Sequence, residues 1–148
     1  MTTTHSPLLA LMLTALGCQG GGSGDGDSGG SSTTGEPPVL EIIGLWDDDV
    51  SGQHDIDNKR WVQAFDPDVY TYFINYFDND LRFVITRTPN DMTYAKFEWI
   101  YVGEQLYYCA SVTGQVSAVA AETGPGADGS DPPAGGCVGA PWHPLTPQ

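Results

Sequence analysis

Apolar and polar residues alternate along much of the chain after residue 38. Leu81, Phe83 and Ile85 lie on one face of an extended chain, and mostly polar residues lie on the other. Residues 94–102 repeat this alternation, with aromatic side chains on one face. A period of two is the pattern of a half-buried β-strand. Both stretches are therefore predicted to be strands.

Runs rich in β-branched and aromatic residues, separated by turn residues, extend this prediction to most of the chain. The expected strands are residues 40–46, 53–57, 60–65, 69–77, 81–87, 94–102 and 105–112. Asp57-Asn58-Lys59 is expected to form the turn of a hairpin. Short connections favour pairing between neighbouring strands, so the predicted fold class is all-β. We expect an antiparallel meander of about six to eight strands, as a curled sheet or a small barrel.

One short helix is predicted near residues 115–122. Thr113 is a possible N-cap before it, and Gly124 follows its end, as is usual for a helix terminus. Residues 124–136 are rich in Gly, Pro and Asp and are predicted to be a loop.

The N-terminal part of the chain has a different pattern. Leu8 to Leu16 is an apolar run of nine residues, shorter than the roughly 20 residues that a transmembrane helix needs. Its length is that of the apolar region of a secretory signal peptide. Gly17 and Cys18 follow the run, and a Gly/Ser-rich tract follows them.

This run with Gly17-Cys18 resembles the signal peptide of bacterial lipoproteins. The resemblance implies that residues 1–17 are removed and that Cys18 becomes the lipidated first residue of a membrane-anchored protein. In that family, Gln19 in place of Asp implies the outer membrane rather than the inner one. The alternative is an ordinary signal peptide, cleaved nearby to leave a free secreted protein.

Residues 18–38 contain no large apolar side chain and are predicted to be a flexible linker. A Gly-rich coil of this length has a mean reach of about 25 Å. Residues 39–148 then form one domain, of a size that supports a single core.

The chain is strongly acidic, with 19 acidic residues, five basic residues and a net charge of −14. This charge argues against nucleic acid or anionic lipid headgroups as partners, because both are polyanions. Solubility of an exported protein is the simpler interpretation of the acidity. The functional alternative is a surface that binds cations.

Three cysteines would leave one odd thiol in an exported protein. If Cys18 carries lipid, as the resemblance implies, Cys109 and Cys137 remain as a disulfide pair in an oxidising compartment. Such a bond would stabilise the fold by roughly 3–4 kcal/mol in the chain-entropy model. Two free thiols or a two-cysteine metal site are the alternatives.

All sixteen aromatic residues lie between Trp46 and Trp142. Most are expected to fill the core of a small β-domain. The functional alternative is an aromatic platform or cavity for a small apolar or sugar ligand. The candidates for it, on two strands expected to pair, are Trp99, Tyr101, Tyr107 and Tyr108.

No catalytic or metal-binding motif is evident. The acidic clusters are Asp47-Asp48-Asp49, Asp55/Asp57, Asp66/Asp68 and Asp78/Asp80. Asp favours turns, and paired Asp residues also suit calcium, but none of the clusters matches the EF-hand spacing. His54 and His143 lack partners at zinc-site spacing, and there is no Gly-x-Ser-x-Gly. His54 lies beside Asp55 and is a candidate general base, but the favoured interpretation is that His54 is an ordinary strand residue. A glycosidase-type pair of carboxylates is a further alternative, because the separation of such a pair is set by the fold and not by sequence spacing.

Two weaker resemblances concern the domain itself. Gly44-Leu45-Trp46 resembles the Gly-x-Trp opening of lipocalin-like barrels. The whole domain resembles small uncharacterised lipoprotein domains of myxobacterial type, which implies a tethered surface or periplasmic protein and no known activity. The elements that carry this resemblance are Gly44-x-Trp46, His54-x-Ile56, Phe97-x-Trp99, Leu106-Tyr107-Tyr108-Cys109, Gly136-Cys137 and Trp142.

Together these features predict a lipid-anchored protein of the cell envelope that acts as a non-enzymatic binding or accessory module. No cofactor is implied, and the membrane is the partner expected through Cys18. The alternatives are a small envelope hydrolase and a purely structural surface lipoprotein.

Overall fold

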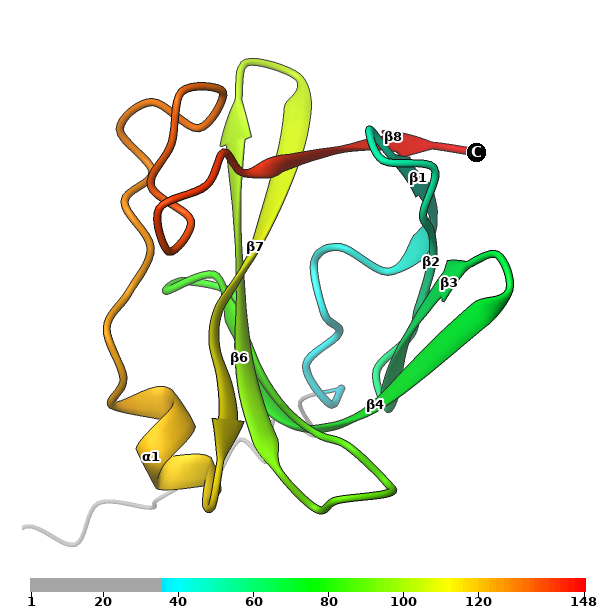
Figure 1. The fold of residues 1–148 in the computed structure, drawn as a ribbon, viewed down its shortest axis with the longest axis vertical. Helices are drawn as coiled ribbons and strands as arrows, with labels where there is room; N and C mark the ends of the chain where they lie inside the picture. The colour runs from blue at the N-terminus through cyan, green and yellow to red at the C-terminus, as the bar shows by residue number, and fades with distance from the viewer. Residues whose placement is uncertain (1–35) are drawn as a thin grey trace, which may run out of the picture. The chain divides into compact units, whose positions relative to one another are not determined.

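The computed structural model describes residues 36–148, and Figure 1 shows their fold. The predicted signal peptide 1–17, Cys18 and most of the predicted linker lie outside the described residues. The elements are β1 (Gly44–Asp48), β2 (Gln53–Ile56), β3 (Arg60–Phe65), β4 (Asp68–Asp78), β5 (Phe83–Arg87), β6 (Tyr94–Val102), β7 (Gln105–Gln115), α1 (Ala118–Glu122) and β8 (His143–Pro147).

The strands form one closed antiparallel barrel, in which each strand pairs with the next and β8 pairs with β1. The predicted all-β meander is therefore confirmed, and the barrel is the form it takes. Hairpin turns alternate between the two ends of the barrel. We call the end with turns 57–59 and 79–82 the closed end, and the end with turns 49–52, 66–67 and 88–93 the acidic end.

Residues 39–43 fill the barrel at the closed end, whereas the sequence predicted that they would extend the first strand. Leu40 and Ile42 are buried in the main core. Figure 1 shows this segment, in cyan, running between β6 and the β2–β3 hairpin. The side-chain oxygens of Asn58 and Asn79 accept hydrogen bonds from its backbone, at 2.8 and 3.0 Å. We call residues 39–43 the plug.

Side chains from the strands fill the rest of the interior, which in an eight-stranded barrel is just wide enough for them. The buried core comprises Leu40, Ile42, Ile56, Trp61, Val84, Ala95, Phe97, Trp99, Leu106, Tyr108 and Leu145. The aromatic face predicted for residues 94–102 is confirmed, since Phe97 and Trp99 lie in this core. The face predicted for residues 81–87 is wrong, because Val84 lies in this core while Leu81 is 70% exposed.

The helix begins later than predicted, because β7 keeps its pairing with β6 as far as Gln115. Residues 115–117 therefore lie outside α1. Ser117, not Thr113, is the N-cap, and its hydroxyl accepts a hydrogen bond from the backbone N–H of Ala120 at 3.1 Å. Among residues 36–148, no helix has the length and apolar character needed to cross a membrane.

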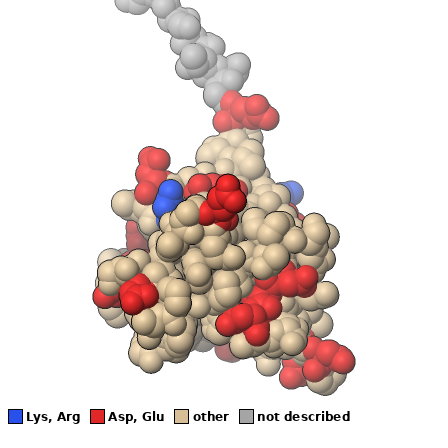
Figure 2. Space-filling view, turned by 90° about the horizontal axis from the view of Figure 1, so that it is seen from above, with Lys and Arg blue, Asp and Glu red and all other residues tan. Residues whose placement is uncertain are grey.

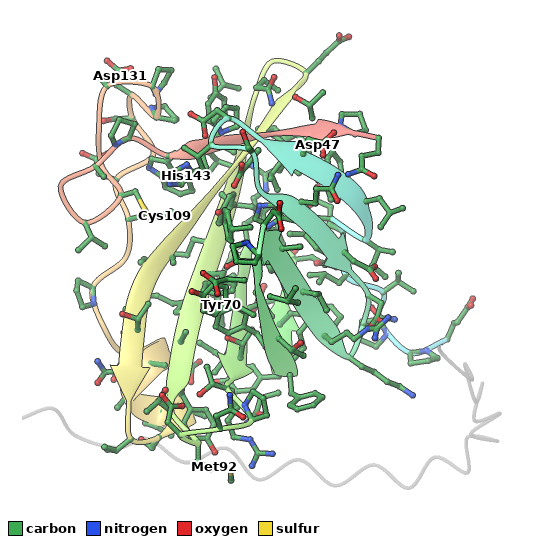
Figure 3. All side chains as sticks on the ribbon, turned by 45° about the vertical axis from the view of Figure 1, so that its right-hand side comes forward. Asp47, Tyr70, Met92, Cys109, Asp131 and His143 are labelled. Atoms are coloured by element: carbon green, nitrogen blue, oxygen red, sulfur yellow. A yellow bond between two sulfur atoms is a disulfide. The ribbon has the colours of Figure 1, made fainter. Side chains whose placement is uncertain are left out.

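A second layer, formed by α1 and residues 123–142, lies outside β6 and β7 (Figure 1). The predicted disulfide between Cys109 and Cys137 is confirmed and joins this layer to β7 (Figure 3). The nearly buried Lys96 donates from Nζ to the carbonyl oxygen of Gly124 at 3.0 Å. Both faces of the β6–β7 hairpin are thus covered, which accounts for its aromatic and apolar residues on both sides.

Candidate functional site

A depression of about 560 Å³ lies at the acidic end, between the β1–β2 and β3–β4 turns. Its lining residues are Asp47, Ser51, Gly52, Gln53, Ala64, Asp66, Pro67, Asp68 and Val69. We call it the acidic depression. Its volume lies within the usual range for small-ligand sites, roughly 300–1,000 Å³.

One outward row across four strands forms part of this depression. Asp47 pairs with Gln53, Gln53 with Ala64, and Ala64 with Val69. Directly opposed residues of antiparallel strands point to the same side of the sheet. Alternation along β1, β2 and β3 places Asp47, Gln53 and Ala64 outside the barrel, since the side chains next to them on the inner face are buried. The register of the barrel, and not the loops alone, therefore builds the site.

The carboxylates of the acidic depression lack basic partners. Among residues 36–148, no Lys or Arg forms an ion pair with Asp47, Asp66 or Asp68. Asp47 accepts one hydrogen bond, from the neutral side-chain amide of Gln148, at 2.7 Å. Figure 2 shows the wider pattern from above: acidic groups cover several parts of the surface and basic groups are few. The depression is thus a concave surface with uncompensated negative charge.

A buried carboxylate holds the turn that forms one wall of the depression. Asp48 Oδ1 accepts hydrogen bonds from the backbone N–H groups of Val50, at 3.0 Å, and Gly52, at 2.5 Å. A Cβ atom at Gly52 would come within 2.5 Å of Asp48 Oδ2 and 2.3 Å of Phe65 Cε1. The tight approach of this turn to the barrel therefore requires glycine at position 52.

The same carboxylate is tied to a buried histidine. His54 Nε2 lies 3.1 Å from Asp48 Oδ2, and Trp61 Nε1 donates to His54 Nδ1 at 2.9 Å. Because the indole N–H is only a donor, Nδ1 must be an acceptor. Neutral His54 therefore carries its proton on Nε2 and donates it to Asp48. Burial lowers the pKa of His54, although the hydrogen bond and charge of Asp48 oppose this shift.

This chain of bonds, Trp61 to His54 to Asp48, bears on the predicted hydrolase alternative. A histidine paired with a carboxylate is part of a nucleophile–His–acid arrangement, but the second nitrogen must face the nucleophile. Here Trp61 donates to that nitrogen, so both ring nitrogens of His54 are hydrogen-bonded inside the core. The carboxylate partner is Asp48, across the β1–β2 turn, and not the adjacent Asp55.

A second histidine lies nearer the surface at the same end. His143 Nδ1 is 3.0 Å from Asp49 Oδ1. The ring of Tyr108 lies between the two histidines, with centroids 4.8 Å from His54 and 5.4 Å from His143. Burial is the main cause of a raised pKa at Tyr108, and the nearby charge of Asp48 adds to it. This cluster is packed structure beneath the acidic end.

The four aromatic candidates do not form one platform. Trp99 and Tyr108 are buried in the barrel core, and the half-buried Tyr101 packs against that core. Tyr107 lies on the opposite face and packs against the Cys109–Cys137 cluster beneath the second layer. Their positions are explained by packing, and none of them lines the acidic depression.

Several acidic clusters show turn chemistry. Asp57 Oδ1 accepts from the backbone N–H of Lys59 at 2.6 Å and of Arg60 at 2.9 Å. Asp78 Oδ1 accepts from the backbone N–H of Leu81 at 2.8 Å. Within the part of the chain that the structure describes, no group of three or more His, Cys, Asp or Glu side chains is placed to hold a metal ion.

Sequence reasoning missed the convergence of Asp47, Asp66 and Asp68, and the pairing of Asp48 with His54. The alternation of residues 53–57 does place His54 on the inner face with Ile56, so burial of His54 could have been inferred. The acidic depression depends on strand register across two hairpins, which no local pattern specifies.

Comparisons of the chain with protein-family models, curated proteins and solved structures found no match. The case for function therefore rests on the geometry and chemistry of the acidic depression.

Proposed function

We propose that this protein is a lipid-anchored, non-enzymatic binding module of the bacterial cell envelope that holds cationic groups in the acidic depression. The anchor would be Cys18, following the resemblance to lipoprotein signal peptides, with the outer membrane as its location. The observation that carries the binding role is the acidic depression itself, a concave surface with three carboxylates that form no ion pair with Lys or Arg within the described domain.

Charge alone would give only weak binding. An exposed ion pair contributes about 0–1 kcal/mol, since water screens it. The depression adds contact area, because Ala64 and the 65% exposed Val69 line it beside the carboxylates. A ligand with a cationic head and an aliphatic stem would match both parts.

The position of the depression suits a tethered binder. The plug enters the domain at the closed end, where the side chain of Asn79 donates to the carbonyl oxygen of Val39 at 2.8 Å. The acidic depression lies at the other end of the barrel. The plug and the acidic depression therefore lie at opposite ends of the barrel.

The buried histidine supports binding over hydrolysis. His54 offers neither ring nitrogen to a substrate, because Trp61 and Asp48 occupy both. A general base needs a free nitrogen within reach of the proton it removes.

Isothermal titration of the full chain with spermidine tests the binding role. We expect Asp66→Asn/Asp68→Asn to weaken binding about tenfold, as the loss of two exposed ion pairs predicts. Glu104→Gln/Asp131→Asn removes the same charge from two exposed positions outside the depression and serves as the control. Equal weakening by both double variants would show attraction to net charge and would contradict the proposed site.

The anchor has its own test. Mass spectrometry of the purified protein should find a mature N-terminus at Cys18 that carries acyl mass. An unmodified N-terminus elsewhere would exclude lipid anchoring and leave the binding role standing.

A further inference from the structure

Four polar side chains lie on the inner face of the barrel toward its acidic end. Trp61 is fully buried in the core, so its partner across the sheet, Tyr72, lies on the inner face. Gln63 and its partner Tyr70 lie two residues further toward the acidic end on β3 and β4, and therefore on the same face. From β7, across the barrel, the ring centroid of Tyr108 lies 5.6 Å from that of Trp61. We call Gln63, Tyr70, Tyr72 and Tyr108 the mouth cluster.

The polar groups of the mouth cluster have no partner in the described domain. Gln63 is only 7% exposed and Tyr108 only 5%, yet among residues 36–148 neither the amide nor the hydroxyl forms a hydrogen bond. The same is true of the two other phenols. Buried polar groups are hydrogen-bonded as a rule. Among the same residues, the one unpaired side-chain N or O atom that solvent does not touch is Arg87 Nε, so the amide and the hydroxyl are open to solvent.

The three phenols of the mouth cluster lie close enough to affect one another. Burial is the main cause of a raised pKa at Tyr72, and the phenol of Tyr70 adds to it. Burial also raises the pKa of Tyr108, with smaller contributions from neighbouring carboxylates and from Tyr72. A depression of about 80 Å³ lies beside them at the rim of the barrel, lined by Tyr70, Tyr72 and residues 88–90 among others. The hydroxyls therefore gather at one opening.

We infer that the mouth cluster binds a neutral, hydroxyl-rich molecule, the terminal unit of a saccharide, at a site separate from the acidic depression. A phenol both donates and accepts, and an amide offers two N–H donors and an oxygen acceptor, so both suit hydroxyl groups. The tyrosine rings add the aromatic surface that small-ligand sites use alongside a few polar groups. The small depression at the rim would take the end of such a molecule and leave the rest in solvent.

A charged ligand fits the mouth cluster less well. None of its four side chains is ionised at neutral pH. The nearest buried carboxylate, Asp48, already accepts hydrogen bonds from its own turn and lies 3.1 Å from His54 Nε2. A quaternary ammonium ion could contact the rings, but it would leave the amide and the hydroxyls unpaired, which is unfavourable for buried polar groups.

An NMR titration of the ¹⁵N-labelled full chain tests this site through the side-chain amide signals of Gln63. The probes are glucose, galactose, mannose and N-acetylglucosamine, each added to about 100 mM, because a few hydrogen bonds at an open site give dissociation constants of about 1 mM or weaker. We expect at least one sugar to shift the Gln63 signals saturably. Absence of a shift with all four would overturn the site.

Two tyrosine variants locate the binding. Tyr72→Phe removes a hydroxyl of the mouth cluster and should weaken binding by about two- to tenfold, the effect of one net hydrogen bond. Because this hydroxyl has no partner in the described domain, the midpoint of urea unfolding should stay the same. Tyr107→Phe removes a hydroxyl on the opposite face of β7 and is the matched control. Equal weakening by both variants would contradict the site.

Two further probes separate the possible results. Choline should leave the Gln63 signals in place, and a shift with choline alone would overturn the assignment to hydroxyl-rich ligands. Spermidine binding without sugar binding would overturn the mouth site and leave the acidic depression as a cation site. Sugar binding without spermidine binding would support the mouth site and overturn the cation site.

Discussion

Carboxylates at the two ends of the barrel differ in their bonding partners. At the closed end, Glu41 accepts a hydrogen bond from Trp99 Nε1 at 3.1 Å and lies 3.9 Å from Arg82 Nε. At the acidic end, one carboxylate, Asp48, is buried and fully bonded, while those of the acidic depression have no basic partner in the described domain. The closed end thus uses charge to hold the fold together. The acidic end leaves charge available to a ligand.

The plug should give the largest effect on stability. Ile42→Ala removes a fully buried side chain and should lower the free energy of unfolding by about 2–5 kcal/mol, as other large-to-small core changes do. Leu81→Ala, at a position of the same end that is 70% exposed, should change it by less than about 0.5 kcal/mol. Urea unfolding measures both. Similar small effects would mean that the plug is not part of the core.

Disrupting the buried hydrogen bonds beneath the acidic end should have an intermediate effect on stability. In Asp48→Asn, the amide N–H₂ would face His54 Nε2 as a donor, which forces the ring proton onto Nδ1 and against the Trp61 N–H. We expect a loss of about 1–3 kcal/mol from this conflict between donors.

Trp61→Phe removes the opposing donor and tests the cause. Asp48→Asn should cost less in the Trp61→Phe background than in the natural protein, by unfolding in a double-mutant cycle. Additive losses would show that the two bonds are independent and would contradict the tautomer assigned to His54.

The same histidine should make the free energy of unfolding depend on pH. The pKa of His54 in the folded protein is lowered from its ordinary value of about 6.5. Below that pH the unfolded chain binds a proton at position 54 that the folded protein resists, so the free energy of unfolding falls as pH falls. The slope has an upper limit of about 1.4 kcal/mol per pH unit for one group. His54→Gln should flatten the curve between pH 6.5 and 5, while His143→Gln should leave most of the slope in place.

The smallest effect should come from the acidic depression. Asp66→Asn/Asp68→Asn removes like charges that have no basic partner in the described domain, so stability should rise slightly, by about 0.5 kcal/mol or less. Thermal unfolding at low salt detects such a change. A clear loss of stability would mean that these carboxylates support the fold, as Glu41 does at the closed end.

Much of the fold follows from local sequence pattern. The alternation in 81–87 and 94–102 and the hairpin turn at 57–59 predicted strands that the barrel contains. The plug was assigned to a strand, because Leu40 and Ile42 are as typical of a strand as of a core. Their place inside the barrel follows only once β8 closes it against β1.

The candidate site was harder to predict, because it too depends on contacts between strands that are distant in the sequence. Asp47, Asp66 and Asp68 come together through the register of two hairpins, and a shift of one residue would turn each strand's side chains to the other face. The bond between Asp48 and His54 likewise spans a turn, so the adjacent Asp55 was the only partner that sequence suggested.

The plug has a mechanical consequence. It lies between the N-terminal side of the chain and β1, and the side chains of Asn58 and Asn79 clamp its backbone. A pulling force applied ahead of residue 36 would reach these clamps and the buried Leu40 before it reached any pair of strands. The barrel would therefore carry tension first through its closed end.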